Sequence, residues 1–182
     1  DYCQELFKSN VTKREQVVVS TINKEKKKKF VPNSVKITSA RFYEKIDSIL
    51  DENLSVIADV GDCMFGAADL VMHHRSSFIA NAYYTSMGCA IPGALGMQLA
   101  QKNKRPLVLV GDGAFQMSCS ELSTIVRLKL NPIVFVLNNG GYTTERYLAA
   151  GSFNDIANWK YHEITKMIGG YGCIVETEDV LD

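Results

Sequence analysis

The chain has 182 residues, enough for one or two domains with a substantial buried core. Its 20 basic and 20 acidic residues cancel, so charge gives no indication of a nucleic-acid or anionic-membrane partner. The five cysteines are scattered and form no C-x-x-C pair, which predicts a reducing, cytoplasmic location and argues against a zinc site or disulfide framework. No apolar stretch approaches the roughly 20 residues of a membrane span.

Residues 1–36 differ in pattern from the rest. Residues 4–22 could form one or two short helices, and a lysine-rich run covers 24–29 before Pro32 interrupts any helix. We interpret the run as a solvated helix end or linker, with a localisation or nucleic-acid patch as the alternative. The chain starts without methionine and in the middle of a pattern, so we expect a fragment or a processed piece.

The segment from 37 to 100 predicts a helix, a strand and a second helix. Thr38 or Ser39 is a candidate cap for a helix that ends at Asn53. A strand over 56–60 runs into Gly61, where the lack of a side chain suits close approach to a ligand. The helix predicted for 88–100 is rich in glycine and alanine, so it can lie close to another backbone.

Two apolar runs, at 107–110 and 133–137, are bounded by glycine and polar residues, as buried strands are. The amphipathic segment between them predicts a crossover helix, which makes the two strands parallel. The carboxyl ends of both strands then lie at the same edge of the sheet, where open parallel sheets bind ligands. We therefore expect Asp112 and Asn139, 27 positions apart, to lie close together.

These polar residues suit a divalent cation and a diphosphate. Mg²⁺ prefers oxygen ligands and is usually held by one or two protein groups together with phosphate oxygens. Asp112 offers a carboxylate, Asn139 offers a carboxamide oxygen, and Gly140-Gly141 allows a backbone carbonyl to turn inward. The amides of residues 113–114 could face the diphosphate.

Towards the end of the chain, a short helix is predicted for 142–150 and a longer one for 159–168. A strand at 173–175 completes the predicted sheet, and residues 176–182 are a charged ending. The whole pattern is that of a three-layer α/β/α fold with a mainly parallel sheet.

The spacing from the aspartate of Gly-Asp-Gly to an Asn-Asn pair resembles the fingerprint of thiamin-diphosphate-dependent enzymes. The continuation Gly-Tyr-Thr-Thr-Glu at 141–145 narrows the resemblance to the 2-oxo-acid decarboxylases that act on pyruvate, indolepyruvate or phenylpyruvate. The segments 57–66, 84–88 and 153–159 extend the likeness, which begins near residue 37. It implies a C-terminal thiamin-diphosphate-binding domain at 37–182, preceded at 1–36 by the tail of another domain and a linker, and lacking the N-terminal pyrimidine-binding domain.

The resemblance also implies roles for individual residues. It assigns the metal to Asp112, Asn139 and Gly141. It assigns the cofactor to Gly61, Asp62, Thr85, Met87, Gly111, Gly113, Ala114, Asn139, Gly141, Tyr142 and Thr143. Met87 would lie between the two rings of the bent cofactor, and the Thr85 carbonyl would accept a hydrogen bond from the aminopyrimidine amine. Glu145 would face the reacting carbon as the catalytic residue.

Three positions depart from the family pattern or mislead. Asp62 stands where a threonine or serine hydroxyl often helps to hold the diphosphate, and a carboxylate is unfavourable beside phosphate. The adjacent histidines 73–74 imitate a catalytic pair that the family carries in its absent N-terminal domain, so we interpret them as a solvated helix end. Thr144 stands where pyruvate-specific members carry isoleucine, which favours a larger aromatic or branched 2-oxo acid.

The predicted function is therefore Mg²⁺- and thiamin-diphosphate-dependent, non-oxidative decarboxylation of a 2-oxo acid to an aldehyde. The isolated chain is expected to be inactive, because it lacks the glutamate that the family supplies from the N-terminal domain across a homodimer or tetramer interface. Two alternatives remain: an acetolactate-synthase-like carboligase, and a non-catalytic partner module that keeps the fold.

Overall fold

The structure is a computed structural model that describes residues 29–73 and 77–182. The helices expected within 4–22, most of the lysine-rich run and residues 74–75 lie outside the described residues. Within the described part, no helix is both long enough and apolar enough to cross a membrane.

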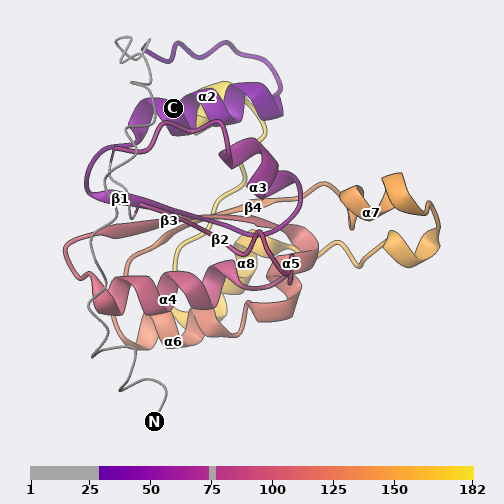
Figure 1. The fold of residues 1–182 in the computed structure, drawn as a ribbon. Helices are drawn as coiled ribbons and strands as arrows, with labels where there is room; N and C mark the ends of the chain where they lie inside the picture. The colour runs from indigo at the N-terminus through magenta and orange to yellow at the C-terminus, as the bar shows by residue number, and fades with distance from the viewer. Residues whose placement is uncertain (1–28, 74–76) are drawn as a thin grey trace, which may run out of the picture.

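The centre of the molecule is a four-stranded sheet in the order β2-β1-β3-β4 (Figure 1). Every neighbouring pair in this sheet is parallel. The strands are β1 (Leu54–Ala58), β2 (Phe78–Ala80), β3 (Arg105–Gly111) and β4 (Ile133–Leu137). The two apolar runs expected to be parallel neighbours are β3 and β4, with Gly111 opposite Leu137 at their carboxyl ends. The first strand begins and ends two residues earlier than the expected 56–60.

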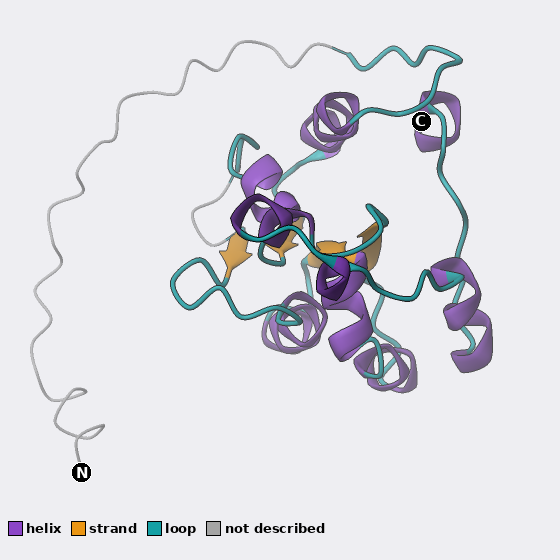
Figure 2. Ribbon diagram, turned by 90° about the vertical axis from the view of Figure 1, so that its right-hand side faces the viewer, coloured by secondary structure: helices purple, strands orange, loops and turns teal. Residues whose placement is uncertain are grey.

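Helices cover both faces of the sheet, which confirms the three-layer fold (Figure 2). One face carries α2 (Ser39–Ile49), α3 (Asp62–Ala67) and the C-terminal α9 (Glu178–Leu181). The other face carries α4 (Ala90–Ala100), α5 (Asp112–Ser118), α6 (Glu121–Arg127) and α8 (Tyr161–Ile168). The helix α7 (Thr143–Leu148) and the 3-10 turn η1 (Ser152–Asn154) project beyond the sheet edge at the right of Figure 1.

Side chains of the central strands alternate between two cores, as the two-residue period of a strand requires. Val56 and Leu107 point into the core beneath α2 and α3, which also contains Phe42 and Ile46. Their neighbours Ile57 and Val108 point to the opposite side, into the core shared with the helices on that face. Burial on both faces explains why these strands are continuous apolar runs in the sequence.

Helix α2 begins as expected and ends earlier than expected. Thr38 is the N-cap, and its hydroxyl oxygen accepts a hydrogen bond from the Arg41 amide at 3.3 Å. The helix ends at Ile49 rather than Asn53, because Asp51 Oδ1 accepts hydrogen bonds from the amides of Asn53 (2.8 Å) and Leu54 (3.1 Å). A short acidic side chain that takes up these amides replaces the helical pattern with a turn.

Other predicted elements were wrong in extent. The crossover segment forms two helices, α5 and α6, instead of one. Helix α4 begins at Ala90 rather than Gly88, because Gly88 has φ of +85°, which a right-handed helix does not allow. Helix α8 begins two residues later than predicted, and α7 is shorter than the predicted 142–150.

The strand predicted at 173–175 is absent among the described residues. The chain after α8 pairs instead with the segment before α2, through an isolated antiparallel bridge between Lys36 and Thr177. Hydrogen bonds from the Ile37 amide to the Glu176 carbonyl (2.9 Å) and from the Glu178 amide to the Val35 carbonyl (3.2 Å) flank this bridge. The apolar side chain of Ile174 is left exposed.

Candidate functional site

Asp112 joins the loops that follow β3 and β4. Its side chain is 1% exposed and accepts three backbone hydrogen bonds. Oδ1 accepts from the Gly113 amide at 2.8 Å, while Oδ2 accepts from the amides of Gly140 (2.7 Å) and Gly141 (3.0 Å). The expected approach of Asp112 to the loop after β4 is therefore present. The contact is made by backbone amides of that loop and not by the side chain of Asn139.

Asn139 makes its side-chain contact with a third loop. Its Nδ2 donates a hydrogen bond to Asp62 Oδ2 at 3.0 Å, and Asp62 is the first residue of α3, just after β1. None of the described residues donates a hydrogen bond to Asn139 Oδ1. The carboxyl ends of β1, β3 and β4 are thus connected through side chains of the predicted site, with the carboxamide oxygen of Asn139 left without a donor.

Two backbone groups of this site already have partners within the chain. The Gly113 amide, which is predicted to face a diphosphate, donates a hydrogen bond to Asp112 Oδ1. The Gly141 carbonyl, which is predicted to turn toward a metal, accepts a hydrogen bond from the Thr143 amide at 3.0 Å. Gly140 and Gly141 do adopt the left-handed backbone that favours glycine, with φ of +78° and +122°, and this directs both amides at Asp112.

Two further close contacts at this edge involve residues that the sequence analysis singled out. A Cβ on Gly113 would collide with the Tyr142 ring and would lie 3.4 Å from Met87 Cε, so the glycine makes room for both side chains. A Cβ on Gly61 would lie 3.4 Å from Thr144 Oγ1, which places the start of α7 beside the end of β1. Gly111 and Ala114 flank this region at the start of α5, with Ala114 fully buried.

Asp59 is a site-forming residue that the sequence reasoning missed. Its side chain is 1% exposed, and it accepts hydrogen bonds from the amides of Val60 and Gly88, each at 3.0 Å, and of Ala90 at 2.8 Å. It therefore fixes the Met87 loop and the start of α4 against the end of β1. The available signal was an aspartate directly after a buried apolar strand, the same position that Asp112 occupies after β3.

The electrostatics of this edge favour a cation. Burial, together with the neighbouring carboxylates of Asp59, Asp62 and Asp112, raises the pKa of the Cys63 thiol to about 12. None of the ion pairs among the described residues involves these three aspartates. Backbone amides stabilise the two buried carboxylates without cancelling their charge.

The residues present fit a diphosphate bound through Mg²⁺. The Thr143 hydroxyl is buried without a hydrogen-bond partner in the described structure, beside the loop that holds Asp112. Thr85, on the loop between β2 and α4, has φ of +52°, an uncommon conformation for a residue other than glycine and one that often occurs at ligand sites. In the described part of the chain, no group of three or more His, Cys, Asp or Glu side chains could hold a metal. Mg²⁺ needs only one or two protein carboxylates when phosphates supply the rest.

Glu145 is the predicted site residue that stands apart. It lies exposed on α7, and no hydrogen bond or ion pair within the described chain involves its carboxylate. The neighbouring Tyr147 and Leu148 are 87% and 81% exposed, so α7 packs little against the domain. The structure does not bring Glu145 into contact with Asp112 or Asn139.

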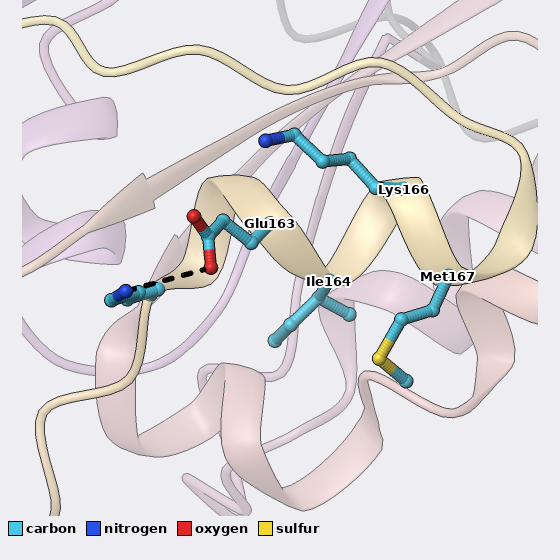
Figure 3. A pocket seen from close by; sticks show the side chains of 5 residues that line it. Glu163, Ile164, Lys166 and Met167 are labelled. Carbon is cyan, nitrogen blue, oxygen red and sulfur yellow. Dashed lines mark ion pairs between the residues drawn. The ribbon is translucent and has the colours of Figure 1, made fainter.

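Two cavities lie outside the group of residues that contact Asp112. One, of about 460 Å³, lies along α8 and is lined by Lys160, Glu163, Ile164, Lys166 and Met167. Figure 3 shows Ile164 and Met167 directed to one side of this helix and Lys166 to the other. The second cavity, of about 260 Å³, lies between the ends of β1 and β2 and the start of α4, and Asn81 and Cys89 contribute to its wall.

A parallel sheet with helices on both faces, and acidic and glycine-rich loops gathered at its carboxyl edge, defines a cofactor-binding α/β domain. Comparison with protein families identifies the particular kind. Residues 59–182 match the model described as the C-terminal TPP binding domain of thiamine pyrophosphate enzymes. The chain belongs to this family, which confirms the resemblance drawn from the Gly-Asp-Gly and Asn-Asn motifs.

Several curated proteins are similar over the same region. An alpha-keto-acid decarboxylase of Mycolicibacterium paratuberculosis is 34% identical over 140 residues, which are 76% of this chain and 25% of that protein. An indole-3-pyruvate decarboxylase of Azospirillum brasilense is 38% identical over 127 residues, or 69% of this chain and 23% of that one. A pyruvate decarboxylase of Aspergillus fumigatus is 37% identical over 152 residues, or 79% and 27%. The chain spans about a quarter of the length of these relatives.

A solved structure shares the fold. The crystal structure of an enzyme from Mycobacterium smegmatis, described as thiamin-diphosphate-dependent, superposes with a TM-score of 0.71. The match covers 86% of this chain and 30% of that one at 23% identity, and it therefore supports the fold alone.

Proposed function

We propose that this chain is the diphosphate- and Mg²⁺-binding part of a thiamin-diphosphate-dependent enzyme that decarboxylates a 2-oxo acid, non-oxidatively, to an aldehyde. The observation that carries the proposal is the Asp112 carboxylate, which is buried and fixed by the amides of Gly113, Gly140 and Gly141 where three strand ends meet. The names of the similar curated proteins support the reaction class.

Each residue of the edge has a task in this proposal. Asp112 and the carboxamide oxygen of Asn139 bind Mg²⁺. The Gly141 carbonyl accepts one hydrogen bond, from the Thr143 amide, and its other lone pair is available to the same ion. The unpartnered Thr143 hydroxyl donates to a diphosphate oxygen. Met87 and Tyr142, which both border Gly113, form the apolar support for the cofactor rings.

When bound, thiamin diphosphate supplies the group that accepts the electrons released as carbon dioxide departs. The protein holds the diphosphate, excludes water and moves protons. Glu145 is the candidate for proton transfer. Because α7 packs little against the domain and Glu145 is exposed, we propose that a neighbouring domain or subunit covers this helix in the intact enzyme.

The substrate proposed is an aromatic or branched 2-oxo acid such as indolepyruvate or phenylpyruvate. Thr144 lies against Gly61 at the start of α7 and is smaller than isoleucine, which leaves more room beside Glu145. An intact enzyme that prefers pyruvate to both aromatic acids would contradict this assignment. Formation of a longer hydroxyketo acid in place of an aldehyde would identify a carboligase instead.

The direct test is a calorimetric titration of the chain with thiamin diphosphate, with and without Mg²⁺. We expect binding that requires the metal, and a crystal grown with both should show the metal between Asp112 and Asn139. As a control for charge, the D69A variant, which removes an exposed carboxylate just after α3, should bind thiamin diphosphate and Mg²⁺ as the wild-type chain does. A crystal of the complex with the metal elsewhere would refute the proposed site. The 182-residue chain alone should release no carbon dioxide from 2-oxo acids.

A further inference from the structure

The Asp62 side chain contacts a proposed metal ligand. Asp62 Oδ2 accepts a hydrogen bond from Asn139 Nδ2 at 3.0 Å, across 77 positions of sequence. A carboxylate can only accept hydrogen bonds, so Asn139 must present its amide nitrogen to Asp62. The carboxamide is planar, with nitrogen and oxygen on opposite branches. Fixing the nitrogen on Asp62 therefore also fixes the direction of the oxygen, to which no described residue donates.

The backbone around Asp62 is itself held in place. The Tyr43 hydroxyl, reaching from α2, donates at 3.2 Å toward the carbonyls of both Asp62 and Cys63. Gly66 makes room for the Tyr43 ring, since a Cβ there would collide with it. Gly61, with φ of +94°, turns the chain sharply between β1 and α3. These contacts determine where the Asp62 carboxylate can reach.

We infer that Asp62 is a positioning residue, which orients the carboxamide of Asn139 so that its oxygen, and not its nitrogen, faces the metal site. The inference rests on the proposed function, because it assigns Asn139 to the metal. The hydrogen bond from Asn139 also gives the acidic side chain of Asp62 a partner at this edge.

Three variants of the 182-residue chain distinguish this role from the alternatives. D62A removes the acceptor. D62N keeps an oxygen that can accept from Asn139 Nδ2 but removes the charge. D69A removes a charge from an exposed aspartate of the same region, to which no described hydrogen bond or ion pair is assigned. Each variant is studied in two ways, one of which needs no ligand.

The ligand-free measurement is the side-chain amide resonance pair of Asn139 in a ¹H–¹⁵N NMR spectrum, assigned as the pair that disappears in N139D. In D62A we expect these resonances to shift and to show faster amide exchange. In D62N they should keep slow exchange, and in D69A they should match wild type. Unchanged Asn139 resonances in D62A would overturn the inference, even if the chain failed to bind cofactor at all.

The second measurement is the apparent affinity for Mg²⁺ at a fixed concentration of thiamin diphosphate. The loss of a single hydrogen bond in D62A should weaken Mg²⁺ by about two- to tenfold. D62N should stay within about twofold of wild type, and D69A should not differ. A loss in D62N as large as that in D62A would make the Asp62 charge itself the functional group, and tighter Mg²⁺ binding in D62A would show repulsion as its main effect. Either result overturns the positioning role. Failure of the wild-type chain to bind would count against the proposed function instead.

Discussion

Asp112 and Asp59 provide a matched pair for separating structural from metal-binding roles. Both follow a buried strand, both are 1% exposed, and each accepts three backbone hydrogen bonds. The proposal assigns a metal only to Asp112. The substitution to asparagine keeps the size of either side chain, so its effects come from hydrogen bonding and charge alone.

The size of the effect follows from the hydrogen bonds. In D112N, the best orientation keeps the amide oxygen toward Gly140 and Gly141 and places the NH₂ group against the Gly113 amide. One charge-assisted hydrogen bond, worth about 1.5–3 kcal/mol, is lost, and a buried amide is left without an acceptor. The other two bonds weaken because the acceptor is now neutral. We expect the free energy of unfolding to fall by about 2–5 kcal/mol.

The same count applies to D59N, where the NH₂ group would face the Ala90 amide and the oxygen would keep Val60 and Gly88. We therefore expect a similar loss of about 2–5 kcal/mol. The two variants should differ in Mg²⁺-dependent binding of thiamin diphosphate. Loss of a group that only supports a metal ligand typically costs 10–100-fold in affinity. D112N should lose at least about tenfold, and folded D59N should keep its dependence on Mg²⁺.

Urea unfolding followed by circular dichroism gives the stability, and calorimetry below the unfolding transition gives the metal dependence. An unchanged stability in D112N would show that its three hydrogen bonds are not formed in solution. Equal loss of Mg²⁺ dependence in both variants would show that the effect is a general loosening of the sheet edge. That second result would refute the assignment of Asp112 as the metal ligand.

Three further substitutions, one of them with a matched control, test other parts of the molecule. Arg41 holds the pKa of Glu178 at about 2 through hydrogen bonds, so this pair should stabilise the fold fully above about pH 4.5 and lose its effect as the pH falls toward 2. Urea unfolding measured at a series of pH values should give E178Q a lower free energy of unfolding than wild type at pH 7. The two values should become equal near pH 2. G141A should destabilise the fold by about 1–3 kcal/mol or more, because its Cβ would collide with the backbone of η1 and its φ of +122° is strained for alanine. The control G96A replaces an exposed glycine of α4 whose added Cβ would meet no atom, so its free energy of unfolding should rise by up to about 1 kcal/mol in the same assay. In the intact enzyme, E145Q should lower carbon dioxide release by about 10²–10⁴-fold and leave calorimetric cofactor binding within a few-fold, and unchanged turnover would contradict the role of Glu145.

The sequence predicted most reliably the features that depend on apolar patterning. The run that became β3 is buried on both faces, so its residues from 107 to 110 had to be apolar, whereas the run that became the edge strand β4 is half-buried. The parallel arrangement followed from the length of the connection between them. The meeting of Asp112 with the loop after β4 is a consequence of that topology. It required no knowledge of side-chain conformation.

Two aspartates accept backbone hydrogen bonds that the sequence pattern alone does not assign to them. Asp51 accepts from the amides of Asn53 and Leu54, and α2 therefore ends earlier than predicted. Asp112 accepts from the Gly113 amide, which is predicted to face a ligand. A short acidic side chain has several amides within reach, and which of them it chooses depends on the packing of loops that lie far apart in sequence.

The strand predicted at 173–175 failed for a different reason. Its β-branched residues suit a strand, but a strand forms only where a neighbour has free amides and carbonyls in register. The chain after α8 crosses from one face of the sheet to the other and meets the segment before α2, so pairing occurs at Thr177 with Lys36. Propensity identified an extended segment, and topology determined its partner.

Charge at the carboxyl edge connects these observations to function. An arginine or lysine beside Asp59 or Asp112 would have stabilised the carboxylate and also neutralised it. Backbone amides stabilise the charge with dipoles that carry no net charge, so the full negative charge of both groups remains. The chain thus holds two buried negative charges, and near them the exposed Asp62, with no cationic side chain paired to any of the three in the described structure. A divalent cation is the simplest species to complete such an edge, and it would at the same time make the edge attractive to the diphosphate of the cofactor.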